Sequence, residues 1–155
     1  MNYQIRGLSP EPFVALYGLS DEALAERRAR RYRANARPGF PDRIELRDVD
    51  PGTDVLLVNY VHQAGSTPYR SSHAVFVREG AERAAVFRNE VPEALKVRSL
   101  SVRAFDADHW MVDADLCEGR DLDDLVRRLL THDTVDYLQV HFAKRGCYAA
   151  RVERA

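Results

Sequence analysis

The sequence has few cysteines, no long hydrophobic run and almost no net charge, and each of these absences excludes a class of protein. Its 155 residues include only two cysteines, Cys117 and Cys147. Two are too few for a disulfide framework or a thiolate zinc site, so we expect a reducing, cytoplasmic compartment. No apolar run approaches the roughly 20 residues of a membrane-spanning helix, so we expect no membrane partner. The first residues carry no apolar core of a secretory signal.

The charge balance argues against a dedicated nucleic-acid binder. The chain has 23 basic and 24 acidic residues and a net charge of −1, whereas such binders usually show a basic excess. Hydrophobic residues make up 45% and charged residues 30%, which is typical of a globular chain. The length fits a single domain over residues 1–155. The glycine-rich nucleotide motifs, the serine-hydrolase elbow and the H-E-x-x-H zinc motif are all absent.

The basic residues are nevertheless unevenly placed. Five arginines crowd into positions 27–33. We interpret them as the last turns of a helix that begins at Ser20, because the helix dipole favours cations at that end. An RNA- or phosphate-binding patch is the alternative. The five residues are Arg27, Arg28, Arg30, Arg31 and Arg33.

Helix signals come first along the chain and strand signals follow. Ser9 and Pro10 predict a helix that ends at Gly18, and Ser20 predicts a second one that stops before the proline-rich segment 35–41. From Arg43 onward, alternating apolar residues predict a strand. The fold class we expect is α+β, with a largely antiparallel sheet, N-terminal helices and one later amphipathic helix. The remaining expected elements are a turn at 50–52, a central strand at 55–61 and its neighbour at 73–77, a turn at 79–80, an edge strand at 84–87, a helical turn at 92–95, a hairpin of 100–105 and 110–116, a helix at 121–130, and a closing hairpin of 137–142 and 147–152.

The best candidate for a functional site lies at the loop between the two central strands. His62 ends one strand and His73 opens the next, so pairing of the strands would bring both imidazoles to the mouth of one loop. Histidine changes charge near neutral pH and often serves as a catalytic base. The ten-residue loop 63–72 contains Tyr69 and Arg70, and an arginine can clamp a carboxylate or phosphate. The alternative is that both histidines are structural residues at strand ends.

The closing hairpin offers a second candidate. His141 and Cys147 are six positions apart around Lys144, Arg145 and Gly146. A three-residue loop would place the imidazole and the thiol on one face, where the imidazole can activate the thiol. A two- or four-residue loop would move the cysteine to the opposite face. A small buried hydrophobic role for the cysteine is the alternative.

A third candidate lies in the hairpin at 100–116. His109, Asp113 and Asp115 point to one side of the second strand and can hold a metal or share a proton. The simpler interpretation is a solvent-facing side with turn aspartates that cap their own backbone. No ligand spacing matches a specific metal motif, so we assign no metal ligands, and the sequence identifies neither a cofactor nor an oligomeric state.

Four stretches carry a family resemblance. The chain resembles a bacterial family known as domain of unknown function 1203 over nearly its whole length. This resemblance implies a single bacterial domain and no particular activity. The stretches are 38–43 (PGFPDR), 57–73 (from LVNYVH to TPYRSSH), 104–107 (AFDA) and 141–150 (HFAKRGCYAA).

The residues together favour a small enzyme that acts on a small anionic metabolite, at the sheet end where loop 63–72 meets turn 144–146. Histidines would move protons, a tyrosine would assist, and basic and amide side chains would bind the substrate. A non-catalytic module that binds a small ligand or a protein is the competing hypothesis. The predicted catalytic residues are His62, His73, Tyr69 and His141, and the predicted substrate-binding residues are Arg70, Arg43, Lys144 and Asn59.

Overall fold

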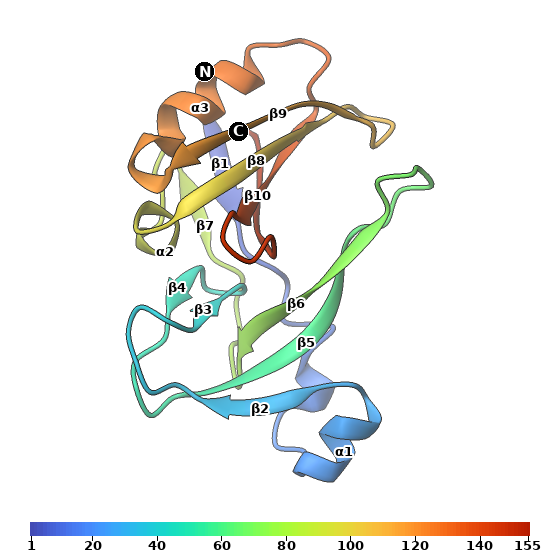
Figure 1. The fold of residues 1–155 in the computed structure, drawn as a ribbon, viewed down its shortest axis with the longest axis vertical. Coiled ribbons are helices and arrows are strands. Elements are labelled where there is room, and N and C mark those ends of the chain that lie inside the picture. Colours follow the sequence, from blue (N-terminus) through green and yellow to red (C-terminus); the bar gives the residue numbers. More distant parts are fainter.

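Antiparallel hairpins, rather than β–α–β units, build the fold in the computed structural model, which describes residues 1–155 (Figure 1). A six-stranded sheet has the order β7-β1-β11-β10-β8-β9, a three-stranded sheet has the order β2-β5-β6, and β3 pairs with β4. This arrangement confirms the predicted α+β class. The strands are β1 Tyr3–Arg6, β2 Arg30–Arg33, β3 Pro41–Asp42, β4 Arg47–Asp48, β5 Asp54–Gln63, β6 Ser71–Arg78, β7 Val86–Arg88, β8 Ser99–Phe105, β9 Met111–Glu118, β10 Tyr137–Phe142 and β11 Tyr148–Arg154.

The helices are short and lie at the periphery. They are α1 (Asp21–Glu26), α2 (Glu93–Lys96) and α3 (Leu122–Leu130), with single turns η1 (Val14–Leu16) and η2 (Gly119–Asp121). The predicted helix at 121–130 is confirmed as η2 and α3. Its apolar stripe at i, i+3, i+4 and i+7 packs on one face of the six-stranded sheet and forms the larger hydrophobic core with it. No helix is long and apolar enough to cross a membrane.

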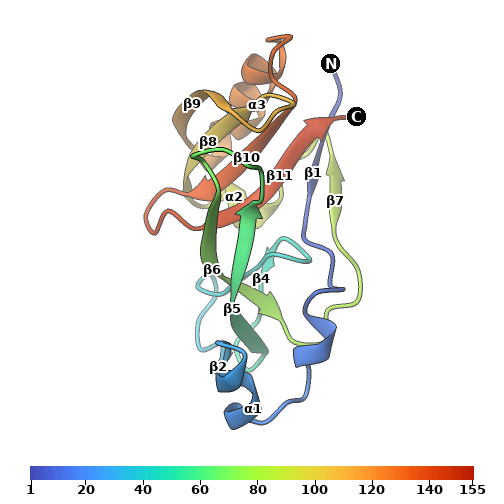
Figure 2. The ribbon, with the colours of Figure 1, turned by 90° about the vertical axis from the view of Figure 1, so that its right-hand side faces the viewer.

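A second, smaller core lies under the three-stranded sheet. It joins Leu56 and Val58 of β5 to Val75 and Val77 of β6, with Phe13 and other side chains from the N-terminal segment packed against them. The two sheets lie at opposite ends of an elongated molecule, and the far end of the β5–β6 hairpin reaches over to β10 (Figure 2). The contact between the two sheets therefore lies between the two hydrophobic cores, and polar side chains gather there.

Two N-terminal predictions need correction. The helix expected from Pro10 is reduced to the single turn η1, although Gly18 does end it with a φ of +73°. Ser20 caps α1 as predicted, its side chain accepting a hydrogen bond from the amide of Ala23 at 3.1 Å. That helix ends after six residues, where Arg28 adopts a φ of +56°.

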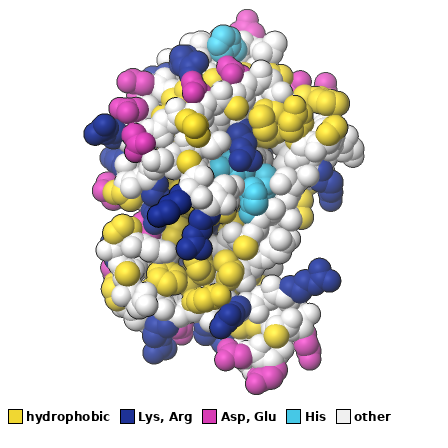
Figure 3. Space-filling model, viewed as in Figure 1, with side chains coloured by type: hydrophobic (Ala, Val, Ile, Leu, Met, Phe, Trp, Pro, Cys, Tyr) yellow, Lys and Arg dark blue, Asp and Glu magenta, His cyan; other side chains and the backbone are white.

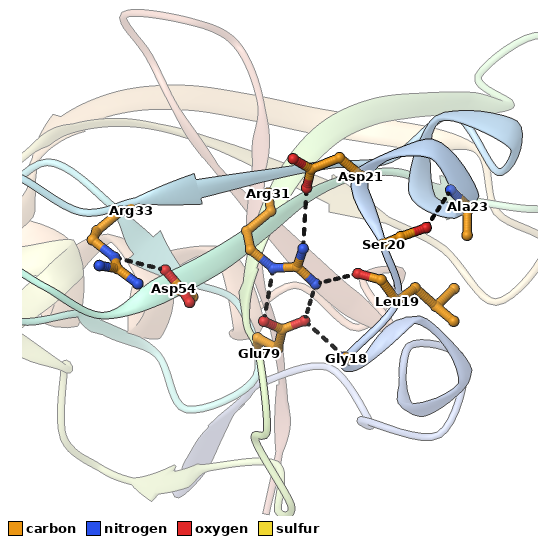
Figure 4. Close-up of polar contacts among 9 residues, drawn as sticks. All are labelled: Gly18, Leu19, Ser20, Asp21, Ala23, Arg31, Arg33, Asp54 and Glu79. Atoms are coloured by element: carbon orange, nitrogen blue, oxygen red, sulfur yellow. Dashed lines mark hydrogen bonds and ion pairs between the residues drawn. The ribbon is translucent and has the colours of Figure 1, made fainter.

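The second half of the arginine run is a strand, whereas Arg27 caps the end of α1 and Arg28 follows it. Arg30–Arg33 pairs with Asp54–Leu57 of β5, so its backbone groups are satisfied by the sheet. Arg31 forms a two-point ion pair with Glu79, at 2.9 and 2.7 Å, and Arg33 meets Asp54 at 3.1 Å (Figure 4). These partners neutralise two of the arginines, which weakens the alternative of a nucleic-acid patch.

The strand expected from Arg43 is also wrong. Residues 43–46 form the turn between β3 and β4, and Leu46 has a φ of +56°. The cause is Asp42, whose buried carboxylate accepts hydrogen bonds from the amides of Ile44 and Glu45, at 3.0 and 2.8 Å. A side chain that bonds its own downstream backbone stabilises a turn in preference to a strand.

The other predicted elements are confirmed within a few residues. The strands at 55–61 and 73–77 are the cores of β5 and β6, and β5 is the central strand of its sheet. The edge strand at 84–87 is β7, and the helical turn at 92–95 is α2. Both late hairpins form as well, as β8–β9 and β10–β11.

The Arg31–Glu79 pair gives a first testable expectation. Glu79→Gln removes a charge that bonds Arg31 and the amide of Gly18, so we expect a loss of roughly 1–3 kcal/mol in urea unfolding at pH 7. The hydrogen bond from Arg31 holds the pKa of this carboxylate below its usual value, against the opposing effect of burial. Stability from a lowered pKa is present above the ordinary pKa and disappears as the pH falls. The difference between variant and wild type should therefore shrink in acid.

Asp54→Asn is the matched control. It breaks the pair with Arg33, whose side chain is 72% exposed, and exposed pairs contribute about 0–1 kcal/mol. Equal losses in the two variants would contradict the importance assigned to the Arg31–Glu79 pair.

Candidate functional site

A β-bulge brings His62 and His73 together. Val61 pairs with Ser72 and Gln63 pairs with Ser71, which leaves His62 as the extra residue of β5. Such a bulge redirects the side chain of the extra residue. The two imidazole rings stack with centroids 4.6 Å apart and an interplanar angle of 13°. The convergence expected from the sequence therefore exists, although the residue directly opposite His73 is Tyr60.

A third histidine joins them from the other sheet. His141 of β10 is fully buried, and its ring lies edge-on to His62 at 4.9 Å and to His73 at 5.4 Å. We call His62, His73 and His141 the histidine cluster. The ring of Tyr148 stacks on His62 at 5.5 Å and covers one side of it. Histidine side chains reach the surface at the centre of one face of the molecule, between groups of basic side chains (Figure 3).

The amide of Gln139 fixes the tautomer of His62. Its Nε2 donates to the backbone carbonyl of His62 at 2.7 Å, so its Oε1 is the end that faces Nδ1 of the same residue, also at 2.7 Å. An amide oxygen only accepts, so Nδ1 of His62 carries the proton. Nε2 of His62 is then a lone pair, and this atom is buried with no hydrogen-bond partner in the protein. The same is true of Nδ1 of His73.

The cluster is uncharged at neutral pH. Burial lowers the pKa of His62 to about 4, against the opposing effect of the hydrogen bond to Gln139 and with the charges of His73 and Arg103 adding to it. Burial, followed by Arg103, lowers the pKa of His141 to about 3, and the same two causes lower the pKa of His73. Three neutral imidazoles therefore lie together beside Arg103, which makes no ion pair, and both ring nitrogens of His141 face oxygen atoms, those of Gly146 and Gln139.

A pocket of about 760 Å³ opens next to the cluster, and His73 lines it. The walls come from both sheets and from the β3–β4 segment. No acidic side chain lines the pocket, while four basic ones do. Arg98 is neutralised by a two-point ion pair with Asp48, and Lys144 and Arg145 of the β10–β11 turn are exposed without partners. The aromatic side chains of the wall are Tyr32, Phe40, Phe76 and Phe142.

Arg43 is the unusual residue of this pocket, because it is 3% exposed and has no carboxylate partner. Its guanidinium donates to the carbonyls of Tyr148 and Pro41, at 2.9 and 2.7 Å, and to the sulfur of Cys147 at 3.1 Å. It also lies over the ring of Phe142, 4.9 Å from the centroid. Burial lowers its pKa to about 10, so the group keeps its charge at neutral pH.

Five of the eight predicted residues do not line this pocket. His62 and His141 contact His73 in the cluster, and the other three lie away from both. The ring of Tyr69 packs edge-on against Trp110 and Phe105, and the guanidinium of Arg70 bonds the carbonyl of Ala64 at the surface. Asn59 bonds Ser72 and is exposed. None of the three lines the pocket that contains His73, Arg43 and Lys144.

Loop 63–72 does not meet turn 144–146 as expected. It packs instead against the turn between β8 and β9, where Thr67 donates to the carbonyl of His109 at 3.3 Å. Gly65 approaches this turn so closely that a Cβ would lie 2.6 Å from the Cβ of His109. The side of the pocket expected from this loop is provided by the β3–β4 segment, of which the sequence indicated only Arg43.

The structure takes the second of the two registers considered for the closing hairpin, so the dyad of His141 and Cys147 does not form. Phe142 donates to the carbonyl of Cys147 and Gly146 donates to that of Phe142, so the loop has four residues, 143–146. The cysteine consequently faces the pocket with Phe142, on the side opposite to His141. Its partner is Arg43.

The third candidate resolves into the simpler alternative. Asp106 accepts hydrogen bonds from the amides of Asp108 and Trp110, so it caps its own turn. His109 bonds the hydroxyl of Tyr137, while Asp115 pairs with Arg128 on α3. The only three side chains placed together as possible metal ligands are those of the histidine cluster.

Two residues of the site escaped the sequence analysis. Gln139 and Arg103 lie opposite each other on β10 and β8, on the same face as His141. The signal for Gln139 was its position two residues before His141 on a strand, which places both on one face.

A scan against protein families matches residues 39–154 to a family described as "Protein of unknown function (DUF1203)". The chain belongs to this family. The matched segment contains the whole histidine cluster, Arg43 and the β10–β11 turn. Searches of curated proteins and of solved structures found no match.

The role of Gln139 can be tested by NMR. In the wild type at pH 7 we expect the ring nitrogens of His62 to show the neutral Nδ1–H tautomer, because Oε1 of Gln139 needs a donor. In Gln139→Leu this acceptor is lost, and the His62 ring should shift toward the Nε2–H tautomer that predominates in free imidazoles. Long-range ¹H–¹⁵N correlation spectra distinguish the two forms.

His132 is exposed and serves as the internal reference in the same spectra. Its signals should be unchanged between wild type and variant. An Nε2–H tautomer for His62 in the wild type would contradict the assigned hydrogen bond.

Proposed function

We propose that this protein is a small enzyme that binds a small organic anion in the pocket between the two sheets, with the histidine cluster exchanging a proton with the bound molecule. The observation that carries the proposal is Arg43, a buried guanidinium with no carboxylate partner that lines the pocket. Burying an unpaired charge costs several kcal/mol. A bound anion would offset that cost.

The remaining lining indicates the kind of anion. Three of the five N–H groups of Arg43 are used by protein acceptors, which leaves two for a ligand. Lys144 and Arg145 add exposed positive charge at the turn, where they can attract the ligand. The aromatic rings of Phe40 and Phe76 favour an apolar or aromatic body. The proposed ligand is therefore a carboxylate or phosphate attached to a flat apolar group.

The enzymatic part of the proposal is supported by the neutral cluster at the pocket wall. His73 belongs both to the cluster and to the pocket, so a bound molecule can reach an uncharged imidazole. A neutral imidazole accepts a proton from a substrate, and Arg43 would stabilise the negative charge that develops. With only two cysteines, neither in a disulfide, the chain suits a reducing compartment, and we propose the cytoplasm.

A non-catalytic binding module is the second candidate function. The apolar half of the pocket lining favours it, because small-molecule binding sites are mostly apolar with a few polar groups. The two functions differ in whether a bound anion is converted. In the enzyme, His73→Ala would abolish turnover of an anion that the variant still binds through Arg43.

Anion binding can be tested with phenyl phosphate and benzoate as probes. We expect both to raise the melting temperature of the protein, whereas benzamide, which has no charge, should not. Lys144→Glu combined with Arg145→Glu should weaken phenyl phosphate binding about tenfold in calorimetric titration, since two nearby attractive charges become repulsive. The effect should diminish as the salt concentration rises.

The matched control is Arg83→Glu, which changes an exposed arginine outside the pocket. Its affinity for phenyl phosphate should equal that of the wild type. Equal binding of benzamide and benzoate, or an unchanged affinity in the double variant, would contradict the proposal.

A further inference from the structure

Two buried nitrogens of the histidine cluster lack the partners that buried polar atoms normally have. Nε2 of His62 and Nδ1 of His73 make no hydrogen bond. An unsatisfied buried polar atom costs roughly 1–3 kcal/mol, and natural structures contain few of them. Both atoms lie in the same cluster and come from neighbouring strands. Two unpartnered nitrogens so close together indicate that one ligand binds both of them.

We propose that His62, His73 and His141 bind one divalent transition-metal ion of the zinc type. One ring nitrogen from each residue lies within 4.8 Å of those of the other two. Three neutral imidazoles are a known ligand set for a metal that keeps an open fourth position. Imidazole nitrogen suits zinc, cobalt, nickel and copper, while the absence of carboxylates disfavours magnesium and calcium.

The outer contacts of the cluster already have the pattern of a metal site. Histidine ligands usually donate their second ring N–H to a carbonyl or carboxylate, which orients the ring. Nδ1 of His62 donates to Gln139 at 2.7 Å. Nδ1 of His141 lies 3.1 Å from the carbonyl of Gly146. Nε2 of His141 lies 3.2 Å from Oε1 of Gln139. If each Nδ1 carries its proton, Nε2 of both residues is a lone pair, and Nε2 of His141 must turn from this oxygen toward the ion.

Metal binding requires a modest closure of the cluster. Zinc–nitrogen bonds of about 2.0–2.1 Å in a tetrahedral site place the nitrogens about 3.4 Å apart. The stacked rings of His62 and His73 must therefore tilt so that both lone pairs meet the ion. His73 is the residue free to move, because β6 is an edge strand and the side chain is only partly buried.

The charges around the cluster define what occupies the fourth position. Arg103 and Arg43 are close enough to influence the histidines, and no acidic residue belongs to the cluster. A dication held by three neutral ligands therefore needs an anion from outside the protein. Because His73 also lines the pocket, the open position of the ion would face the anion bound there. The metal site thus rests on the proposed function and adds to it. With the ion bound, the imidazole of His73 would be a ligand and would no longer accept the proton; a hydroxide in the open position would do so instead.

The test uses full-length protein without a histidine tag, treated with a chelator and then titrated with Co²⁺. We expect one Co²⁺ per chain and visible absorption bands of a four- or five-coordinate site. His73→Ala should abolish stoichiometric binding. Gln139→Leu should weaken it about 10- to 100-fold, because the ligand His62 loses its orienting acceptor. His132→Ala, at an exposed histidine outside the cluster, should bind Co²⁺ like the wild type.

X-ray absorption of the zinc-loaded wild type keeps the test decisive if a variant fails to fold. Three imidazole nitrogens at about 2.0–2.1 Å are expected. Absence of stoichiometric binding, fewer than three imidazoles, or unchanged binding in folded His73→Ala would overturn the metal site. Phenyl phosphate binding by the metal-free protein would in that case leave the proposed anion pocket standing. Conversely, Co²⁺ binding without affinity for either anion would refute the pocket and keep the metal site.

Discussion

The side-chain amide of Gln139 determines how the end of the β5–β6 hairpin lies on the six-stranded sheet. It bonds His62 twice, once to the ring and once to the backbone carbonyl, with both distances at 2.7 Å. An amide that donates and accepts to the same residue fixes position and orientation together. The histidine cluster requires this contact, because His141 comes from one sheet and the other two histidines come from the other. The pocket requires it as well, since its walls are divided between the same two sheets.

The region where the two sheets meet is polar, although a hydrophobic core lies on each side of it. The larger core occupies the face of the six-stranded sheet covered by α3, and the smaller one lies under the three-stranded sheet. Between them stand the cluster, the buried Arg43 and a chain of hydrogen bonds from Gln63 through the hydroxyl of Tyr137 to His109. Apolar residues of similar volume in such a position would often stabilise a protein as well or better. The retention of so many polar groups here is therefore more easily explained by function than by stability.

The sequence predicted those parts of the fold that depend on local patterns. Alternation and turn residues located β5, β6 and both late hairpins, and the apolar stripe located α3. The predictions failed where a side chain or a distant strand decided the structure. Asp42 converts an alternating segment into a turn, and pairing with β5 converts Arg30–Arg33 into a strand. In the site, too, local sequence patterns were predictive and contacts between distant segments were not. His62 and His73 are close in sequence and were found, whereas the placement of Cys147 depended on one residue of loop length, and the contacts of Gln139 and Arg103 depended on how two sheets meet.

Electrostatics connects the two proposals. Arg43 and Arg103 place positive charge beside the cluster, and the side chains that line the pocket contain no carboxylate. Many metal sites offset part of the charge of the ion with an aspartate or glutamate ligand. A site of three neutral imidazoles offsets none of it, so the ion adds its full charge to that of the arginines. The protein itself provides no counter-charge at this point. A small anion bound in the pocket would supply it, and for this reason a metal in the cluster should strengthen anion binding, as each would reduce the electrostatic cost of the other.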